Sequence, residues 1–249
     1  MFQALLAVVW LACETGPSYD SAQEADTIEA YEAFLVADPT SMFKDQATRR
    51  LEELYFEKGL ALGTVEAWDA YHQRFPEGGR KGEDAARKRT QAHYDAAMAK
   101  GDLASLEGFA KAFPKAGWLT SRAAGRAAVL AYGKLSFAET RVEGINLAED
   151  PKGEKNGWGV FVDVTNGGDA TFEFLSMTIE LLGPDGVVLE TRDYPLVSPT
   201  WDLPAEPIQM APMKPGEMRT WEWSVGYEYA PKGFDGRVRV TPTGLRALP

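Results

Sequence analysis

The chain is poor in the residues that build disulfides, metal sites and histidine-dependent catalytic sites. Its 249 residues include a single cysteine, Cys13, and two histidines, His72 and His93. One cysteine excludes a disulfide framework and a structural zinc site. The sequence has no Gly-x-Ser-x-Gly, His-Glu-x-x-His or Gly-Lys-Ser/Thr motif. We therefore expect no enzymatic activity, no catalytic residues, no metal and no cofactor.

Basic residues are also scarce relative to acidic ones. The chain has 26 Lys and Arg against 37 Asp and Glu, which gives a formal net charge of −11. Affinity for phosphates comes from Lys and Arg, so we expect no nucleic-acid partner. The same balance disfavours docking on anionic lipid. With 45% hydrophobic and 25% charged residues, the composition is that of a globular protein.

No apolar run is long enough to cross a bilayer, which takes about 20 residues. Residues 2–12 carry no charge, and they are followed by Cys13 and a polar stretch. An apolar run of this length is typical of a signal peptide. A plain secretory signal, or an apolar N-terminal helix with an inert buried Cys13, also fits these residues.

The segment Leu11-Ala12-Cys13 resembles the lipobox of bacterial lipoproteins. The resemblance implies cleavage before Cys13 and acylation of its sulfur and its amino group. Residues 1–12 are then the signal peptide and residues 13–26 a linker. Several acyl chains anchor a protein stably, so the implied location is the bacterial cell envelope, attached to a membrane.

Residues 27–135 contain an internal repeat. Three similar segments precede prolines spaced 37 and 38 residues apart: 28–34 before Pro39, 65–71 before Pro76 and 103–109 before Pro114. Each segment follows a good N-cap residue, namely Thr27, Thr64 or Asp102. Apolar residues then recur at every third position, as on one face of a helix. The period is typical of stacked helical pairs.

A longer helix is expected after each proline. We align Ala47 with Ala86 and Ala124, taking the loops after Pro76 and Pro114 to be two residues longer than the first. The order of small, aromatic, Gly and Pro positions resembles degenerate tetratricopeptide repeats, over about 110 residues. The resemblance implies about three helix pairs. Aromatic residues on the helix faces are expected in the core.

Residues 136–249 change to the alternating pattern of strands. Strands are expected near 137–142, 158–164, 170–182, 187–194, 218–225 and 237–241. A tight turn is expected at 183–186. This number of strands favours a β-sandwich. We therefore expect a multidomain chain, all-α followed by all-β, with an N-terminal helical repeat domain at 27–135 and a sandwich domain at 136–249.

The second half resembles the immunoglobulin-like sandwiches of envelope proteins, particularly the FxLYD type. The matching segments are 164–168, 179–188 and 214–217, with Leu181-Leu182-Gly183 in place of Leu-Tyr-Asp. Such domains imply binding or spacing. A basic cluster at 80–89 and a proline-rich loop at 198–213 are expected to be, respectively, a solvated helix face and a connection between strands.

These features predict a non-enzymatic, membrane-anchored lipoprotein that acts as a protein-interaction scaffold in the envelope, with an unidentified protein partner and no small-molecule substrate. The alternative is an envelope module in which the sandwich binds a glycan or a peptide through Trp201, Trp221 or Trp223. Trp221 and Trp223 lie on one face of their strand, so this alternative loses its support if that face is core.

Overall fold

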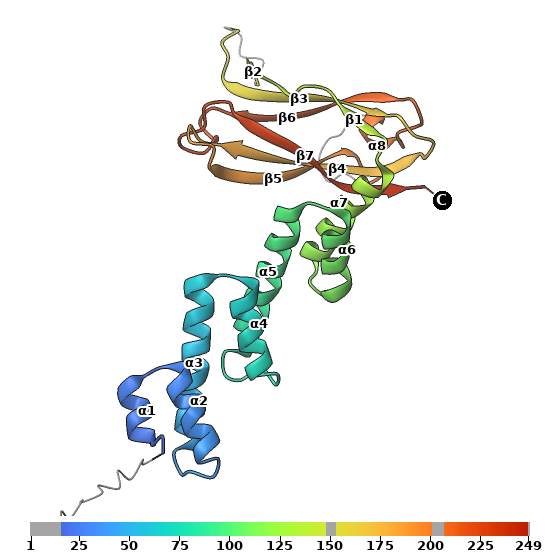
Figure 1. Ribbon diagram of the computed structural model, residues 1–249. Coiled ribbons are helices and arrows are strands. Elements are labelled where there is room, and N and C mark those ends of the chain that lie inside the picture. The colour runs from blue at the N-terminus through green and yellow to red at the C-terminus, as the bar shows by residue number, and fades with distance from the viewer. Residues whose placement is uncertain (1–15, 148–152, 201–206, 249) are drawn as a thin grey trace, which may run out of the picture. The chain divides into compact units, whose positions relative to one another are not determined.

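The computed structural model describes residues 16–147, 153–200 and 207–248 (Figure 1). Within these ranges helices come first and strands follow. The helices before the strands are α1 (Tyr19–Ala25), α2 (Ile28–Ala37), α3 (Lys44–Leu62), α4 (Val65–Arg74), α5 (Gly82–Lys100), α6 (Leu103–Ala112) and α7 (Trp118–Tyr132). The strands are β1 (Leu135–Phe137), β2 (Arg141–Ile145), β3 (Gly157–Asn166), β4 (Phe172–Leu182), β5 (Val188–Val197), β6 (Met218–Gly226) and β7 (Val238–Ala247), with a short helix α8 (Pro207–Met210) before β6. The expected order of helices and then antiparallel strands is confirmed.

The helix starts lie where the cap residues predict them. The side chain of Thr27 accepts a hydrogen bond from Ala30 N–H, Thr64 accepts from Ala67 and Asp102 accepts from Ser105. Each of the three short helices ends two residues before its proline. One helix was not expected: α1 lies within 13–26, the predicted linker, where Ser18 and Ser21 form a capping box.

The predicted register of the longer helices is wrong by one residue. Ala86 and Ala124 are exposed, whereas their neighbours Ala85 and Ala123 are 3% and 0% exposed. The buried alanine follows eight residues after Pro39, as Ala47, but nine residues after Pro76 and Pro114. The later loops are therefore longer by one residue, and a two-residue estimate rotates the expected core face by about 100°.

The strands form two antiparallel sheets. In the first, β1 and β2 pair with β3 along one edge and β6 pairs with β3 along the other. In the second, β4 lies between β5 and β7. The single strand expected at 137–142 is two short strands, β1 and β2, which pair with successive parts of β3. Val162 of β3, Ile179 of β4 and Trp221 of β6 belong to one buried apolar cluster. The two sheets therefore share one core and form a sandwich (Figure 1).

Helix α7 packs on the face of the β5-β4-β7 sheet opposite this core. Thr178, whose neighbours Met177 and Ile179 face the core, is 4% exposed and accepts a hydrogen bond from Arg122 of α7 at 2.9 Å. Gly125 of α7 brings the helix backbone against Thr243 and Gly244 of β7. The chain divides into two compact units, Met1–His93 and Tyr94–Pro249, so α6 and α7 belong to the unit that contains the sheets.

Candidate functional site

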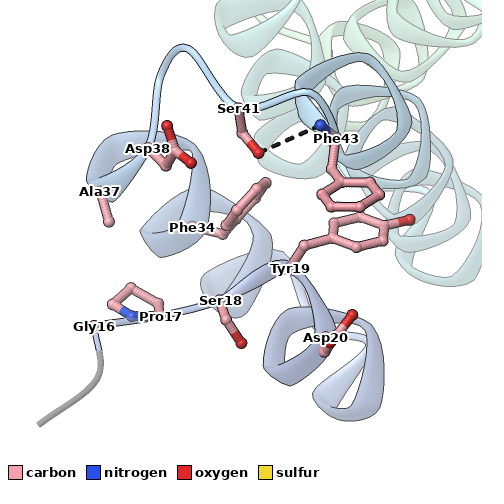
Figure 2. A pocket seen from close by; sticks show the side chains of 10 residues that line it. All are labelled: Gly16, Pro17, Ser18, Tyr19, Asp20, Phe34, Ala37, Asp38, Ser41 and Phe43. Carbon is pink, nitrogen blue, oxygen red and sulfur yellow. Dashed lines mark hydrogen bonds between the residues drawn. The ribbon is translucent and has the colours of Figure 1, made fainter. Parts of the chain in front are cut away.

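The described residues contain a pocket beside the first two helices, here called the α1–α2 pocket. Its volume is about 420 Å³. Ten residues line it: Gly16, Pro17, Ser18, Tyr19, Asp20, Phe34, Ala37, Asp38, Ser41 and Phe43. Figure 2 shows these side chains around the hollow, with the Tyr19 and Phe43 rings side by side. The lining comes from the start of α1, the end of α2 and the loop before α3.

Local capping positions the start of α1. Ser18 is extended, with φ −93° and ψ 163°, and its side chain accepts from the Ser21 backbone N–H. The helix therefore begins at Tyr19. Gly16 and Pro17 lie outside the helix and form one wall of the α1–α2 pocket. At the other end, Asp26 adopts the left-handed conformation, with φ 46°, and stops the helix. These caps keep α1 to seven residues.

Aromatic rings form the floor of the α1–α2 pocket. Phe34 is 3% exposed, and its ring lies 5.7 Å from that of Tyr19. The Tyr19 and Phe43 rings stack with centroids 4.7 Å apart and planes 8° apart. The Phe43 backbone N–H donates to the Ser41 hydroxyl at 3.3 Å, which holds the loop against the pocket (Figure 2).

The charged side chains that line the α1–α2 pocket are all acidic. The lining includes two carboxylates, Asp20 and Asp38, and no basic side chain. Residues 16–43 contain six acidic residues and no Lys, Arg or His. Two of the six are paired with later residues: Asp26 with Arg50 at 2.8 Å and Glu32 with Arg74 at 2.6 Å. The hydrogen bond from Arg50 lowers the pKa of Asp26, so this carboxylate stays ionised.

Aromatic rings with carboxylates, in the absence of basic groups, favour organic cations. A cation over an aromatic face is attracted by the ring quadrupole, and a nearby carboxylate adds Coulomb attraction. The volume lies within the range of small-ligand sites, about 300–1,000 Å³. The lining side chains include no thiol, imidazole or amine. The arrangement therefore suits binding, and it brings together no nucleophile with a histidine or lysine base.

A second, smaller pocket of about 190 Å³ lies at the next helix pair, lined by Arg49, Glu52, Glu53, Arg80 and Lys81. Glu52 is 5% exposed and accepts hydrogen bonds from the Tyr71 hydroxyl at 2.8 Å and from the Lys81 backbone N–H at 2.7 Å. Burial alone raises the pKa of Glu52, but these hydrogen bonds outweigh it and the pKa is lowered. The carboxylate is therefore an ionised structural group that holds the loop before α5.

The two pockets occupy equivalent places in the repeat. Tyr19 and Phe34 are 15 residues apart, as are Phe56 and Tyr71, whose rings are 6.2 Å apart. Where Phe43 covers Tyr19, the ammonium group of Lys81 lies 5.5 Å from the centroid of the Phe56 ring. The third pair repeats the spacing with Tyr94 and Phe109, covered by Trp118. One member of the series thus already holds a cation on its aromatic ring.

The residues proposed from sequence lie elsewhere. Cys13 and Trp201 are outside the described residues. Trp221 and Trp223 are 1% and 7% exposed and belong to the sandwich core, so the expected glycan or peptide site on these side chains is wrong. The Trp221 indole N–H donates to the Tyr194 carbonyl at 3.1 Å, which completes its burial.

The basic cluster and the proline-rich loop have structural partners. Arg87 pairs with Asp84 and Arg89 with Asp69. The buried guanidinium of Arg219 donates to the carbonyls of Ile208, Ala211 and Pro212, which fixes the described part of the loop. Within the described ranges no group of three or more His, Cys, Asp or Glu side chains is placed to hold a metal. No described helix has the length and apolar character that crossing a membrane requires.

Two sequence patterns indicate the α1–α2 pocket, and both lie before the repeat expected at 27–135 or at its start. The segment Gly16-Pro17-Ser18 followed by Ser21 indicates a helix start. Tyr19 stands at the same distance from Phe34 as Phe56 does from Tyr71. Together these two patterns extend the repeat toward the N-terminus by one short helix.

No family model and no curated protein matches the chain. Among solved structures it is similar to the Pseudomonas fluorescens alkylpurine DNA glycosylase AlkC bound to DNA containing an abasic site analog. The identity is 11% and the TM-score 0.36, over 93% of this chain and 64% of the glycosylase chain, less than two thirds of its length. It is also similar to the putative ApaA protein from Bordetella pertussis, with 15% identity and a TM-score of 0.24 over 46% of this chain and 91% of that one.

Two functional expectations are corrected by these comparisons. The expected role as a lipoprotein scaffold of the envelope is contradicted by these comparisons, in which the structure that covers most of this chain is described as a DNA glycosylase and neither protein is described as a lipoprotein. The exclusion of nucleic acid as a partner is wrong on the same finding, since AlkC is bound to DNA. At a TM-score of 0.36 the likeness assigns neither glycosylase activity nor DNA binding to this chain.

Proposed function

We propose that this chain is a non-catalytic binding protein that recognises an organic cation, an ammonium or guanidinium group on an aliphatic stem, in the α1–α2 pocket. One observation carries the proposal: an aromatic floor lies beside Asp20 and Asp38, in a stretch from 16 to 43 that contains no basic residue. The stem packs on Phe34 and the Tyr19–Phe43 stack, and the charged end faces the carboxylates.

The second helix pair supports this reading. There the ammonium of Lys81 occupies the place over Phe56 that Phe43 occupies over Tyr19. A cation on an aromatic ring contributes about 0.5–1 kcal/mol at an exposed site and about 2 kcal/mol when desolvated. The partly exposed floor of the α1–α2 pocket belongs to the lower end of this range.

Calorimetric titration of the full chain tests the proposal. The ligands are n-butylguanidinium, n-butyltrimethylammonium and the neutral isostere n-butylurea. We expect both cations to bind and n-butylurea to bind at least fivefold more weakly, because it lacks the charge. Asp38→Asn removes about 1 kcal/mol of Coulomb attraction in water, which is about a fivefold loss of cation affinity.

Asp45→Asn is the matched control. Asp45 is an exposed carboxylate in the first turn of α3 and does not line the pocket. We expect this variant to bind both cations as the parent chain does. Binding of n-butylurea with the same affinity as n-butylguanidinium, or equal losses in the two Asn variants, contradicts a cation site.

We further propose that the two sheets form an immunoglobulin-like sandwich. Two features support this proposal. Strand β3 has β1 and β2 on one edge and β6 on the other, and β4 lies between β5 and β7. In immunoglobulin domains strand B lies between A and E, and strand C pairs with F. Nuclear Overhauser contacts between β3 and β6 backbone amides test the order. The envelope location and acylation of Cys13 also stay predictions, supported by residues 2–13 alone.

A further inference from the structure

The three short helices of the repeat end with the same backbone geometry. Their C-cap residues are Asp38 of α2, Phe75 of α4 and Phe113 of α6, and each stands directly before a proline. The φ values of these caps are −133°, −125° and −124°, and the ψ values are 75°, 68° and 58°. Because the backbone is nearly the same at all three positions, the C-cap side chains leave their helices in nearly the same direction.

In the second and third helix pairs the C-cap side chain is an aromatic ring that packs on the ring one turn before it. The Phe75 ring lies 5.3 Å from that of Tyr71. The Phe113 ring lies 5.1 Å from that of Phe109, with the planes 27° apart. Phe75 also makes an edge contact with Tyr55 of α3 at 5.9 Å and is only 8% exposed. The chain's own rings therefore fill the end of the short helix in these pairs.

The first helix pair lacks both of the rings that meet at this place in the second. Asp38 and Ser18 lie 37 residues before Phe75 and Tyr55, which is the period of the repeat. Asp38 and Ser18 both line the α1–α2 pocket, together with Phe34 (Figure 2). The pocket therefore lies where two aromatic side chains of the repeat are replaced by a carboxylate and a small hydroxyl.

The end of α2 also lacks the positive charge found at the equivalent helix ends. Helix α4 has His72 and Arg74 in its last turn and α6 has Lys111, whereas α2 has no basic residue there. The C-terminus of a helix carries a partial negative charge, which a cation stabilises and an anion destabilises. Of these three helix ends, only that of α2 combines this partial charge with a carboxylate at the C-cap, Asp38.

We infer that the cation bound in the α1–α2 pocket is a guanidinium group, which takes the place of the missing C-cap ring and pairs through two N–H groups with the Asp38 carboxylate. The inference rests on the proposed function and names the chemical class of its ligand. A guanidinium is planar, packs on aromatic rings and forms two parallel hydrogen bonds with a carboxylate. A primary ammonium is a compact point charge, and a trimethylammonium group has no N–H to donate.

Calorimetric titration of the full chain with three butyl cations tests the inference. The cations n-butylguanidinium, n-butylammonium and n-butyltrimethylammonium carry the same charge on the same stem. We expect n-butylguanidinium to bind about tenfold more tightly than either of the others, because only this cation combines a planar group with paired donors. Titration with agmatine and with Nα-acetyl-arginine amide then distinguishes the two sources of this chemistry, a free guanidinium compound and an arginine side chain of a polypeptide.

Asp38→Phe tests the place of the ligand. This variant has the C-cap residue of the other two pairs, so we expect it to fold and to bind n-butylguanidinium at least twentyfold more weakly than the parent chain. Asp38→Asn keeps one acceptor oxygen and should at least halve the preference for n-butylguanidinium over n-butyltrimethylammonium, which tests the pairing independently of the added ring. Asp45→Phe is the control, since Asp45 is an exposed residue of α3 that does not line the pocket, and its binding should be unchanged.

The outcomes separate this inference from the proposed function. Equal affinities for n-butylguanidinium and either other cation, or undiminished n-butylguanidinium binding by folded Asp38→Phe, overturn the inference and leave the cation site standing. If none of the three cations binds more tightly than n-butylurea, the cation site and the inference both fail.

Discussion

Two glycines in neighbouring helices make the contact between α7 and the sheet testable. Gly125 of α7 has no room for a side chain: an added Cβ would lie 2.6 Å from the Thr243 carbonyl oxygen and 2.8 Å from the Gly244 Cα. Gly108 of α6 has no neighbouring atom within 4 Å. Both residues lie inside helices of the same compact unit, so the same substitution measures two different environments.

Alanine at these positions is expected to have opposite effects on the free energy of unfolding. Gly108→Ala stabilises by about 1 kcal/mol, because alanine has the higher helix propensity. Gly125→Ala gains the same propensity, but α7 must move by about 0.8 Å to bring the Cβ from 2.6 Å to an ordinary contact of 3.4 Å. Overpacking of this kind costs about 1–3 kcal/mol, so the net effect is a loss of about 1 kcal/mol.

Urea unfolding followed by tryptophan fluorescence measures the difference. Trp118, Trp158, Trp221 and Trp223 all lie in the unit that contains both glycines. The expected difference between the two variants is about 2 kcal/mol, with midpoints on opposite sides of the parent chain. If Gly125→Ala is as stable as Gly108→Ala, α7 does not pack on β7 by close backbone contact and the described interface is refuted.

Three further predictions concern single side chains. The folded-state pKa of Glu52 is lowered, so the ionised carboxylate stabilises the fold above the unfolded pKa near 4.5, and this stabilisation is lost as pH falls through the folded-state pKa. Glu52→Gln should therefore make the melting temperature less dependent on pH in the acid range. Glu53→Gln, the control, should leave that dependence unchanged. Arg219→Met leaves three carbonyls without their donor, so the free energy of unfolding should fall by about 2–3 kcal/mol. The 208–212 loop should then become sensitive to limited proteolysis. Arg192→Met, at a more exposed arginine, is the control. In native membranes the intact mass should be that of a chain starting at acylated Cys13, and a free thiol on a chain that retains residues 1–12 contradicts this.

Local patterns predicted the helical half well because its rules act over short distances. Thr27, Thr64 and Asp102 cap helices by bonding residues three positions away, and this relation is visible in the sequence. Register across loops was predicted poorly. Whether Ala85 or Ala86 faces the core depends on one residue of loop length, and no local rule sets that length.

Long-range contacts explain what the strand pattern left out. Asn166, in the 164–168 segment of the FxLYD resemblance, is fully buried. It accepts a hydrogen bond from the Tyr132 hydroxyl at 2.8 Å and donates to the Ala170 carbonyl. This bond joins the end of α7 to the end of β3 across 34 residues. Alternation predicts which face of a strand is buried, but it does not say which helix lies on the opposite face.

The candidate site follows from an irregularity in the repeat. Identical spacing of Tyr19 and Phe34, and of Phe56 and Tyr71, predicts two similar aromatic contacts. Their surroundings differ because α1 begins only after Pro17 and its N-cap Ser18, whereas α3 extends further toward its N-terminus and buries Glu52. In the second pair this place is filled by the chain's own helix, whereas the shortened first helix leaves the aromatic floor open among the described residues. Asp20 and Asp38 line this place without a basic side chain, so it favours a cation over an anion.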